Sequence, residues 1–460
     1  MKIYKKIMCS ILVVICAMLS FCVSGCGCKR TLKYQDFAQE DFGDIPVVRI
    51  DTQNEFFPVS KEEYVNCSFS LENAGDYNFE VSMKESTSAE DSVGIRRRGN
   101  NTYSMPKVPF RVKFNKKKSV LGLEKAKSWV LLADYIDQSD MRNYTAFSMA
   151  NYFDGLGFTP TPNHVILFLN DEYMGVYLLV EQIDENKGRT AVEKDFTIQE
   201  NANYPFLVEM SHDNGIDEVS YDIFNINGFE PFEIKYPEYD ERSATQTSDP
   251  VLEYIKNYVT AITQTISNHN ATAVFNGQEM KFEDLVDEDS FIDYMLVNEF
   301  MLNLDNIWKS VYFYKSTNGK VIFGPIWDFD FCLTDVWTGS PYKDAEMNRA
   351  YYTYATRYNW FFKSYLQDEV NYQKVQARWN LAYSKLTNEG SGLNAMLTNY
   401  KSKIKDQVSC DAEYWYGKTG KQQFETQYNY VQAVLVERAS FMNTLFGKDY
   451  QSFASQAGVR

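Results

Sequence analysis

After residue 45, the first part of the chain alternates between apolar and polar residues in short runs separated by Gly and Asn. A period of two is typical of half-buried β-strands. The runs lie at 46–50, 64–70, 77–81, 93–97 and 110–114. A continuous apolar run at 129–133 fits either a buried strand or the start of a helix. The pattern predicts a mainly β region that extends to Glu181.

Two pairs of apolar runs are each joined by a short turn and predict β-hairpins. The first pair spans 165–169 and 173–180, around Asn170-Asp171. The second pair spans 311–314 and 321–327, around Asn318-Gly319. Asn-Gly between alternating runs is the strongest short-range hairpin signal.

Helical spacing dominates the rest of the chain. Apolar residues recur at helical intervals in 251–268, in 291–300 after Asp287 or Asp289 as a cap, and in 346–447 with breaks near 390 and 417–420. A shorter helix is expected between Asp140, as its cap, and Phe153. A chain in which most predicted strands come first and most predicted helices come later is typical of an α+β fold.

The first residues have the pattern of an export signal. Lys2, Lys5 and Lys6 precede an apolar run from 7 to 23. This run is short for a membrane span, although a single-pass anchor would also fit. The run ends in Val-Ser-Gly-Cys at 23–26, which resembles the bacterial lipobox.

We therefore predict a lipoprotein signal peptide at 1–25 and a polar tether at 26–44, with Cys26 as the lipidated residue. An ordinary signal peptide cut near residue 25 is the alternative. Lipidation would attach the chain to the membrane, on the outer face of the bacterial cytoplasmic membrane.

Composition excludes several classes of protein. Among 460 residues, 44% are hydrophobic and 23% are charged, as in globular proteins, so the chain as a whole is not disordered. The formal net charge of -16 argues against nucleic acid as a partner. Three His, well separated, make a His-rich zinc centre or a Ser-His-Asp mechanism improbable. The cysteines are too widely spaced for a disulfide scaffold, and Cys67 and Cys332 are expected to be buried thiols.

Three acids flank the second predicted hairpin. Asp305 precedes it, and Asp328 and Asp330 follow its second strand. Scaffolds place reactive groups at strand ends, and two acids two residues apart can reach one hard cation. A general base and a metal site facing one pocket would fit, and so would solvated or capping carboxylates.

Basic residues gather upstream. Arg96, Arg97 and Arg98 precede Gly99, and Lys113 lies on the next predicted strand. Phosphate is bound by cations and exposed backbone N–H groups. A solvated basic face is the competing interpretation. Glu181, at the end of its strand, would either pair with Lys113 or simply end the strand.

Taken in order, these segments resemble the CotH family of atypical secreted protein kinases, known from bacterial spore coats. The resemblance covers about 45–450. The matching segments are RRRGNNT (96–102), PFRVKF (109–114), SWVLLA (128–133), MRNY (141–144), LNDEYMGVYLLVE (169–181), KYP (235–237), NLD (303–305) and GPIWDFD (324–330).

The resemblance implies a reduced, atypical, bilobal protein-kinase-like fold with a mainly β N-lobe and a mainly helical C-lobe. The N-lobe would span 93–181, after an N-terminal β segment at 45–92, and the C-lobe would span 182–460. The implied activity is transfer of the γ-phosphoryl group of ATP to Ser or Thr hydroxyls of proteins, with Mg²⁺ or Mn²⁺.

The resemblance also implies roles for individual residues. Asp305 would be catalytic, and Asp328 would bind metal, assisted by Asp330. Arg98 and Lys113 would bind the phosphates of ATP.

Glu181 would be one of the residues that line the nucleotide pocket.

One departure from protein kinases concerns the residue five positions after the catalytic Asp, where kinases have a metal-binding Asn. This position is Ser310 here. A full G-x-G-x-x-G loop is also missing.

Two other functions remain open at this point. A catalytically inactive kinase-like protein would serve as a surface binding or assembly module. A different enzyme, acting on nucleotides or carbohydrates, would use paired acids of the same kind.

Overall fold

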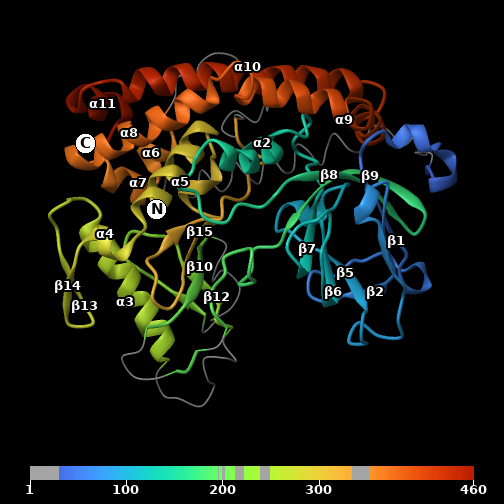
Figure 1. Ribbon diagram of the computed structural model, residues 1–460, viewed down its shortest axis with the longest axis horizontal. Coiled ribbons are helices and arrows are strands. Elements are labelled where there is room, and N and C mark those ends of the chain that lie inside the picture. The colour runs from blue at the N-terminus through green and yellow to red at the C-terminus, as the bar shows by residue number, and fades with distance from the viewer. Residues whose placement is uncertain are drawn as a thin grey trace, which may run out of the picture.

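The computed structural model describes residues 31–194, 196–198, 203–212, 222–238, 249–333 and 353–459. The fold is α+β and has two lobes (Figure 1). One lobe is a large curled sheet, and the other combines a smaller sheet with most of the helices. The bilobal architecture predicted from the sequence is confirmed.

The sheet of the first lobe has nine strands in the order β2-β5-β6-β7-β9-β8-β1-β3-β4. The strands are β1 (Val47–Ile50), β2 (Val65–Cys67), β3 (Phe69–Glu72), β4 (Phe79–Val81), β5 (Val93–Arg97), β6 (Phe110–Lys118), β7 (Ala126–Leu132), β8 (Asn163–Leu169) and β9 (Glu172–Glu181). The pairing is antiparallel except between β1 and β8. The apolar run at 129–133 is therefore strand rather than helix, and the segment 45–92 adds strands at both edges of this sheet.

Each face of the sheet is buried against its own core. On β6, Phe110, Val112 and Phe114 point into a core inside the curled sheet. On β9, Val176 and Val180 point the other way, into the larger core shared with the second lobe. This double burial accounts for the nearly continuous apolar sequence of β9.

The predicted hairpin around Asn170-Asp171 is confirmed as β8 and β9. Asn170 and Asp171 have φ values of 51° and 65°, as a type I′ turn requires.

Helix α2 (Arg142–Ser148) precedes this hairpin, and the cap predicted for it is wrong. The carboxylate of Asp137, and not that of Asp140, accepts hydrogen bonds from the backbone N–H groups of Met141 and Arg142, at 3.0 and 2.8 Å.

The second lobe is built around a five-stranded sheet in the order β11-β12-β10-β15-β16. Its strands are β10 (Phe206–Met210), β11 (Ile223–Phe224), β12 (Phe232–Tyr236), β15 (Val311–Lys315) and β16 (Ile322–Phe323), and a separate hairpin consists of β13 (Ala273–Phe275) and β14 (Gln278–Met280). The hairpin predicted around Asn318-Gly319 is confirmed as β15 and β16.

The helices of this lobe follow the predicted spacing. They are α3 (Pro250–Thr265), α4 (Phe282–Leu285), α5 (Glu288–Phe300), α6 (Ala355–Tyr358), α7 (Trp360–Tyr365), α8 (Glu369–Leu386), α9 (Leu393–Tyr416), α10 (Gly420–Phe446) and α11 (Tyr450–Ala457). Asp287, one of the two expected caps, accepts a hydrogen bond from the backbone N–H of Ser290. The long helices α9 and α10 lie along one side of the molecule, and α9 reaches β9 of the first lobe (Figure 1).

Residues 34–42, inside the predicted tether, form two short 3-10 turns. Tyr34, Phe37 and Phe42 pack around Phe168 of β8. Cys67 and Cys332 are buried free thiols, as predicted. Within the described part of the chain, no helix is both long enough and apolar enough to span a bilayer.

Candidate active site

Segments from both lobes meet at a cleft of about 240 Å³. The first lobe contributes the turn after β5 and the end of β7. The second lobe contributes the segments that follow β10, α5 and β16. Four residues predicted from the sequence line this cleft together, namely Arg98, Asp305, Asp328 and Asp330.

Asp305 begins a 3-10 turn just after α5. The turn is fixed by buried amides, since Asn303 Oδ1 accepts from the backbone N–H of Asp305 at 3.2 Å. Asn306 Nδ2 donates to the hydroxyl of Tyr294 at 2.8 Å, and Asn359 Nδ2 donates to the carbonyl of Asn306 at 2.6 Å. The carboxyl group of Asp305 is thus held on a rigid support at the floor of the cleft.

Asp328 and Asp330 lie on the turn that follows β16. The backbone N–H of Phe329, whose ring is fully buried, donates to Asn143 Oδ1 at 3.0 Å. Arg142 Nε donates to the carbonyl of Cys332 at 2.8 Å. The MRNY segment recognised in the sequence therefore anchors the turn that carries the two acids.

Lys309 and Ser310 connect Asp305 to Asp328. Lys309 Nζ lies 2.9 Å from Asp305 Oδ2 and 3.9 Å from Asp328 Oδ2. Ser310 Oγ donates to Asp328 Oδ2 at 3.0 Å. The residue that stands in the place of the kinase Asn is therefore a hydrogen-bond donor to the acid predicted to bind metal. Sequence reasoning did not identify Lys309, although its spacing of four residues from Asp305 is a detectable signal.

Some residues that line the cleft have a strained backbone. Asp134, Ser310 and Asp328 line the cleft and have φ values of 46°, 56° and 67°. Positive φ is uncommon outside glycine, and such strain clusters at functional sites. Gly99, with φ of 87°, forms the opposite wall, where an added Cβ would lie 2.2 Å from Thr102 Oγ1.

Arg98 enters the cleft from the end of β5. Its backbone N–H donates to the carbonyl of Pro109, and its guanidinium carbon lies 5.4 Å from the centroid of the Trp327 ring. Burial lowers the pKa of Arg98, whereas Tyr312 and Asp328 raise it. The guanidinium is thus available to an anionic ligand in the cleft.

The other predicted residues lie elsewhere. Lys113 is exposed on β6, with Nζ 5.8 Å from the centroid of the Tyr64 ring, and does not line the cleft. Glu181 is buried at the end of β9, where Oε2 accepts from the backbone N–H of Thr161 at 2.7 Å. Cys26 lies outside the described residues.

Sequence reasoning also missed two further charged residues of the cleft, Asp134 and Lys107. Asp134 follows β7 and accepts from Asn143 Nδ2 at 2.8 Å through Oδ1, while its buried Oδ2 has no hydrogen-bond partner. Lys107 is 1% exposed, and its Nζ lies 2.9 Å from Asp411 Oδ2 on α9. The contact between Lys107 and Asp411 joins residues 304 positions apart in the sequence, so no local sequence pattern indicates it.

The acids of the cleft repel one another. Burial, with the charge of Asp328, raises the pKa of Asp305 to about 6, although Lys309 opposes the shift. Burial and the neighbouring acids raise the pKa of Asp330 well above its ordinary value. Burial and Asp137 raise the pKa of Asp134 to about 7.

This arrangement fits a divalent cation. Asp330 Oδ1 and Asp134 Oδ2 are buried and accept no hydrogen bond, and carboxylate oxygen is the ligand that Mg²⁺ prefers. Among the described residues, no three His, Cys, Asp or Glu side chains form a group that could hold a metal ion. Mg²⁺ commonly uses one or two carboxylates and completes its shell with water and substrate phosphates, so a site with fewer than three protein ligands is compatible with this cation.

The sequence was compared with known protein families and with curated proteins. The family model described as CotH kinase protein matches residues 95–442, which include every lining residue named above. No curated protein matches the chain. Because the family model covers more than half of the 460 residues, the chain belongs to the CotH kinase family.

Proposed function

We propose that the chain is an ATP-dependent Ser/Thr protein kinase of the CotH type. The observation that carries the proposal is the meeting of Asp305, Asp328 and Asp330 with the cations of Arg98 and Lys309 in one cleft between the lobes. Phosphoryl transfer depends mainly on positioning and on charge neutralisation, and this group of residues supplies both.

Asp305 is the acceptor-side residue in this proposal. Its carboxylate orients the hydroxyl of the acceptor Ser or Thr and takes its proton as the oxygen attacks the γ-phosphorus. The bond from the γ-phosphorus to the β,γ-bridging oxygen breaks in the same step, and ADP leaves. A pKa of about 6 keeps the group mostly ionised at neutral pH and basic enough to accept the proton. Lys309 holds this carboxylate in place through its 2.9 Å contact.

Asp328 and Asp330 would hold the divalent cation, and Ser310 orients Asp328. Mg²⁺ or Mn²⁺ held there would offset the negative charge that develops on the phosphates of ATP. Arg98 neutralises phosphate charge from the opposite wall. Because neither Lys113 nor Glu181 lines the cleft, the proposal assigns ATP binding to the residues of the cleft and not to these two.

The decisive experiment is incubation of the purified full chain, in detergent, with γ-labelled ATP and Mg²⁺ or Mn²⁺, beside Asp328→Ala. We expect label on a Ser-containing acceptor protein with the wild type and none with the variant. If the wild type transfers no label with either metal and ATP does not raise its melting temperature, the chain is instead a non-catalytic surface module.

We also propose that the protein is exported and lipid-anchored through Cys26. The support is the charged start, the apolar run at 7–23 and the lipobox-like ending at 23–26. Growth of an expressing bacterium with a labelled fatty acid tests this. Label on the wild type that is lost in Cys26→Ser supports the anchor, and an unlabelled wild-type chain contradicts it.

A further inference from the structure

Three cations form a strip that leads away from the cleft along one face of the first sheet. Arg96 on β5 stands directly opposite Arg111 on β6, and Lys113 lies two residues beyond Arg111. Alternation puts these three side chains on the face opposite Val112 and the inner core. We call Arg96, Arg111 and Lys113 the basic strip.

The basic strip is continuous with the cleft. Arg98 lies just after β5, two residues from Arg96, and Pro109 lies just before β6, two residues from Arg111. Arg98 and Pro109 both line the cleft. At about 3.3 Å per residue, Lys113 is about 13 Å along β6 from Pro109. The proximity of Arg96 and Arg111 also contributes to lowering the pKa of Arg98.

None of the three cations forms an ion pair or other contact with a carboxylate of the described residues. The Nε atoms of Arg96 and Arg111 are buried and donate no hydrogen bond. Arg111 donates through Nη2 to Ser128 Oγ at 3.1 Å, while Arg96 and Lys113 lie over the ring of Tyr64. Like charges directly opposite each other on neighbouring strands are destabilising, so the fold keeps this pair at a cost.

Two neighbouring cations have partners that the strip lacks. Arg97 points to the other face, where Nε donates to the carbonyl of Pro58 at 2.8 Å and the guanidinium lies over the rings of Phe57 and Tyr103. Further along β6, Lys116 is ion-paired with Glu90. The Nε atom of Arg97 and the ammonium group of Lys116 thus have acceptors within the protein, whereas the Nε atoms of Arg96 and Arg111 have none.

We infer that the basic strip docks an acidic, Asp/Glu-rich segment of the acceptor polypeptide, next to the residue that enters the cleft. The inference rests on the proposed function, since it assumes that a polypeptide hydroxyl is the acceptor. Carboxylates would supply the acceptors that the guanidinium groups of Arg96 and Arg111 lack. The strip then selects acceptor sites by the charge of the residues beside them.

A polypeptide fits the basic strip better than other anions do. The strip is only two strands wide, which is a small footprint for the phosphate backbone of a nucleic acid. The phosphates of ATP belong near the acids and Arg98, whereas the strip extends beyond the cleft lining. An acceptor polypeptide must lead out of the cleft, and this charged face of the sheet adjoins it.

The test measures peptide binding without transfer, by fluorescence anisotropy on the full chain in detergent. The probes are two labelled peptides with one central Ser, flanked by Asp and Glu in one and by Asn and Gln in the other. We expect the wild type to bind the acidic peptide about tenfold more tightly. Arg111→Gln with Lys113→Gln should abolish that preference, and Lys113→Gln alone should halve it or more.

Lys116→Gln is the matched control, because it removes one positive charge from the same strand and should keep the preference. Melting temperature with ATP and Mn²⁺ is measured in parallel and should rise equally in the wild type and the double variant. Equal binding of the two peptides by the wild type would overturn the inference. So would a lost preference in Lys116→Gln, or a loss of the ATP effect in the double variant, which would assign the strip to the nucleotide.

The experiment separates this inference from the proposed function. Binding of the acidic peptide that depends on the strip supports docking even if no phosphoryl transfer occurs, as in a non-catalytic module. Conversely, transfer to both peptides at equal KM overturns the docking strip and leaves the kinase standing. If the double variant does not fold, the exposed Lys113→Gln variant decides between these outcomes.

Discussion

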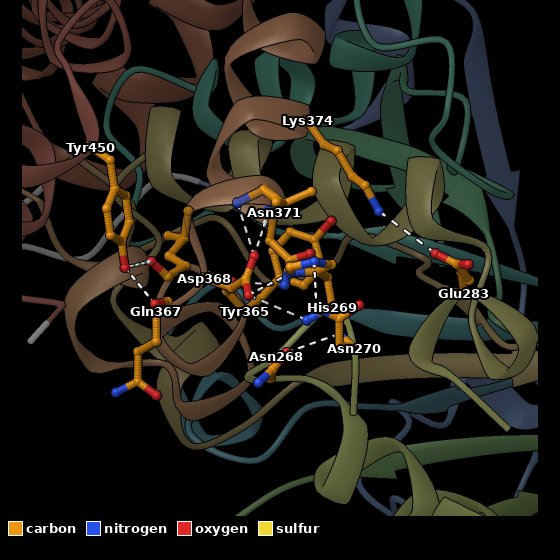
Figure 2. Close-up of polar contacts among 12 residues, drawn as sticks. Asn268, His269, Asn270, Glu283, Tyr365, Gln367, Asp368, Asn371, Lys374 and Tyr450 are labelled. Atoms are coloured by element: carbon orange, nitrogen blue, oxygen red, sulfur yellow. Dashed lines mark hydrogen bonds and ion pairs between the residues drawn. The ribbon is translucent and has the colours of Figure 1, made fainter. Parts of the chain in front are cut away.

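Carboxylates in two regions of this molecule differ in whether their oxygens have hydrogen-bond or ion-pair partners. At the start of α8, Asp368 Oδ1 accepts from the backbone N–H groups of Val370 and Asn371, at 2.9 and 3.1 Å. Its Oδ2 lies 2.8 Å from His269 Nδ1, and Asn270 contacts the other ring nitrogen (Figure 2). Every oxygen of this carboxylate is therefore engaged by the protein itself.

The same region contains a second satisfied acid. Glu288 contacts Lys374 at 2.7 Å and accepts from the hydroxyl of Tyr365 at 2.6 Å, while Lys374 also lies 3.8 Å from Glu283. Burial by itself would raise the pKa of Asp368, but the hydrogen bonds from His269 and Asn371 outweigh it and leave the pKa below its usual value. Acids of this kind stabilise the fold.

In the cleft, the effect of burial on the pKa of the acids outweighs that of their hydrogen bonds. Asp134 and Asp330 each have a buried oxygen without a hydrogen-bond donor, and the pKa values of both are raised. A structural role does not account for carboxylates that repel one another in a buried place. The acids of the cleft therefore lack donors that Asp368 and Glu288 have, and this arrangement fits a site that a cationic ligand completes.

The largest expected effect comes from Asp305→Asn, which removes the proposed base and keeps its shape. We expect the rate of phosphoryl transfer to fall by about 10³-fold or more, because a general base and its charge are both lost. Single-turnover assays with γ-labelled ATP measure this. Melting temperature serves as the control, and a variant with wild-type turnover would remove Asp305 from the mechanism.

Lys309→Met should have the next largest effect. The neutral side chain keeps most of the volume of lysine but leaves Asp305 and Asp328 without the cation between them. We expect kcat to fall by about 10²-fold, with partial rescue by Lys309→Arg. If Lys309 only stabilised the fold, the melting temperature would fall and kcat per folded molecule would not.

A third prediction concerns ligand removal. ATP with Mn²⁺ should raise the stability of the wild type by about 2–3 kcal/mol at saturating concentrations, because ligands that bind only the folded state stabilise it. EDTA should abolish most of that gain, and Asp328→Ala should show little of it. The α8 region supplies the control, since Glu283→Gln should respond to ATP and Mn²⁺ as the wild type does.

These contrasts also show how far the sequence could predict the site. The acids Asp305, Asp328 and Asp330 were identifiable because they lie at the ends of strands and helices with clear periodicity, and Arg98 because it precedes a glycine turn. Residues that belong to local patterns can thus be identified from the sequence, and the structure brings these four to one cleft.

Residues whose roles depend on distant contacts were not identifiable. Lys107 meets Asp411 only because α9 packs on β9, where an added Cβ on Gly175 would lie 1.9 Å from Asp411 Oδ1. Asp134 enters the cleft because its backbone has positive φ. Similarly, Asp137 caps the helix in place of the predicted Asp140, because the preceding turn folds back on the helix.

The opposite pKa shifts predict opposite effects of pH on stability, measured in EDTA. A raised pKa means that the folded state binds its proton more tightly than the unfolded chain does, so Asp134 destabilises the fold as pH rises from about 4 to 7. Asp134→Asn should therefore be more stable than the wild type by about 2 kcal/mol at pH 7, and this advantage should vanish near pH 4. Urea unfolding at both values measures it, and a variant less stable at pH 7 would contradict the repulsion in the cleft.

The smallest expected effect tests the other side of the comparison. Asp368→Asn keeps an oxygen that can cap α8 but loses the charge beside His269, whereas Asp368→Ala loses both, so we expect costs of about 0.5 and about 1.5 kcal/mol at pH 7. Because the pKa of Asp368 is lowered, its charge stabilises the fold above about pH 4, and this contribution disappears as the pH falls further. Neither variant should change phosphoryl transfer per folded molecule. A loss of transfer without a loss of stability would mean that the α8 cluster also serves the cleft, and the division between satisfied structural acids and unsatisfied functional acids would no longer hold.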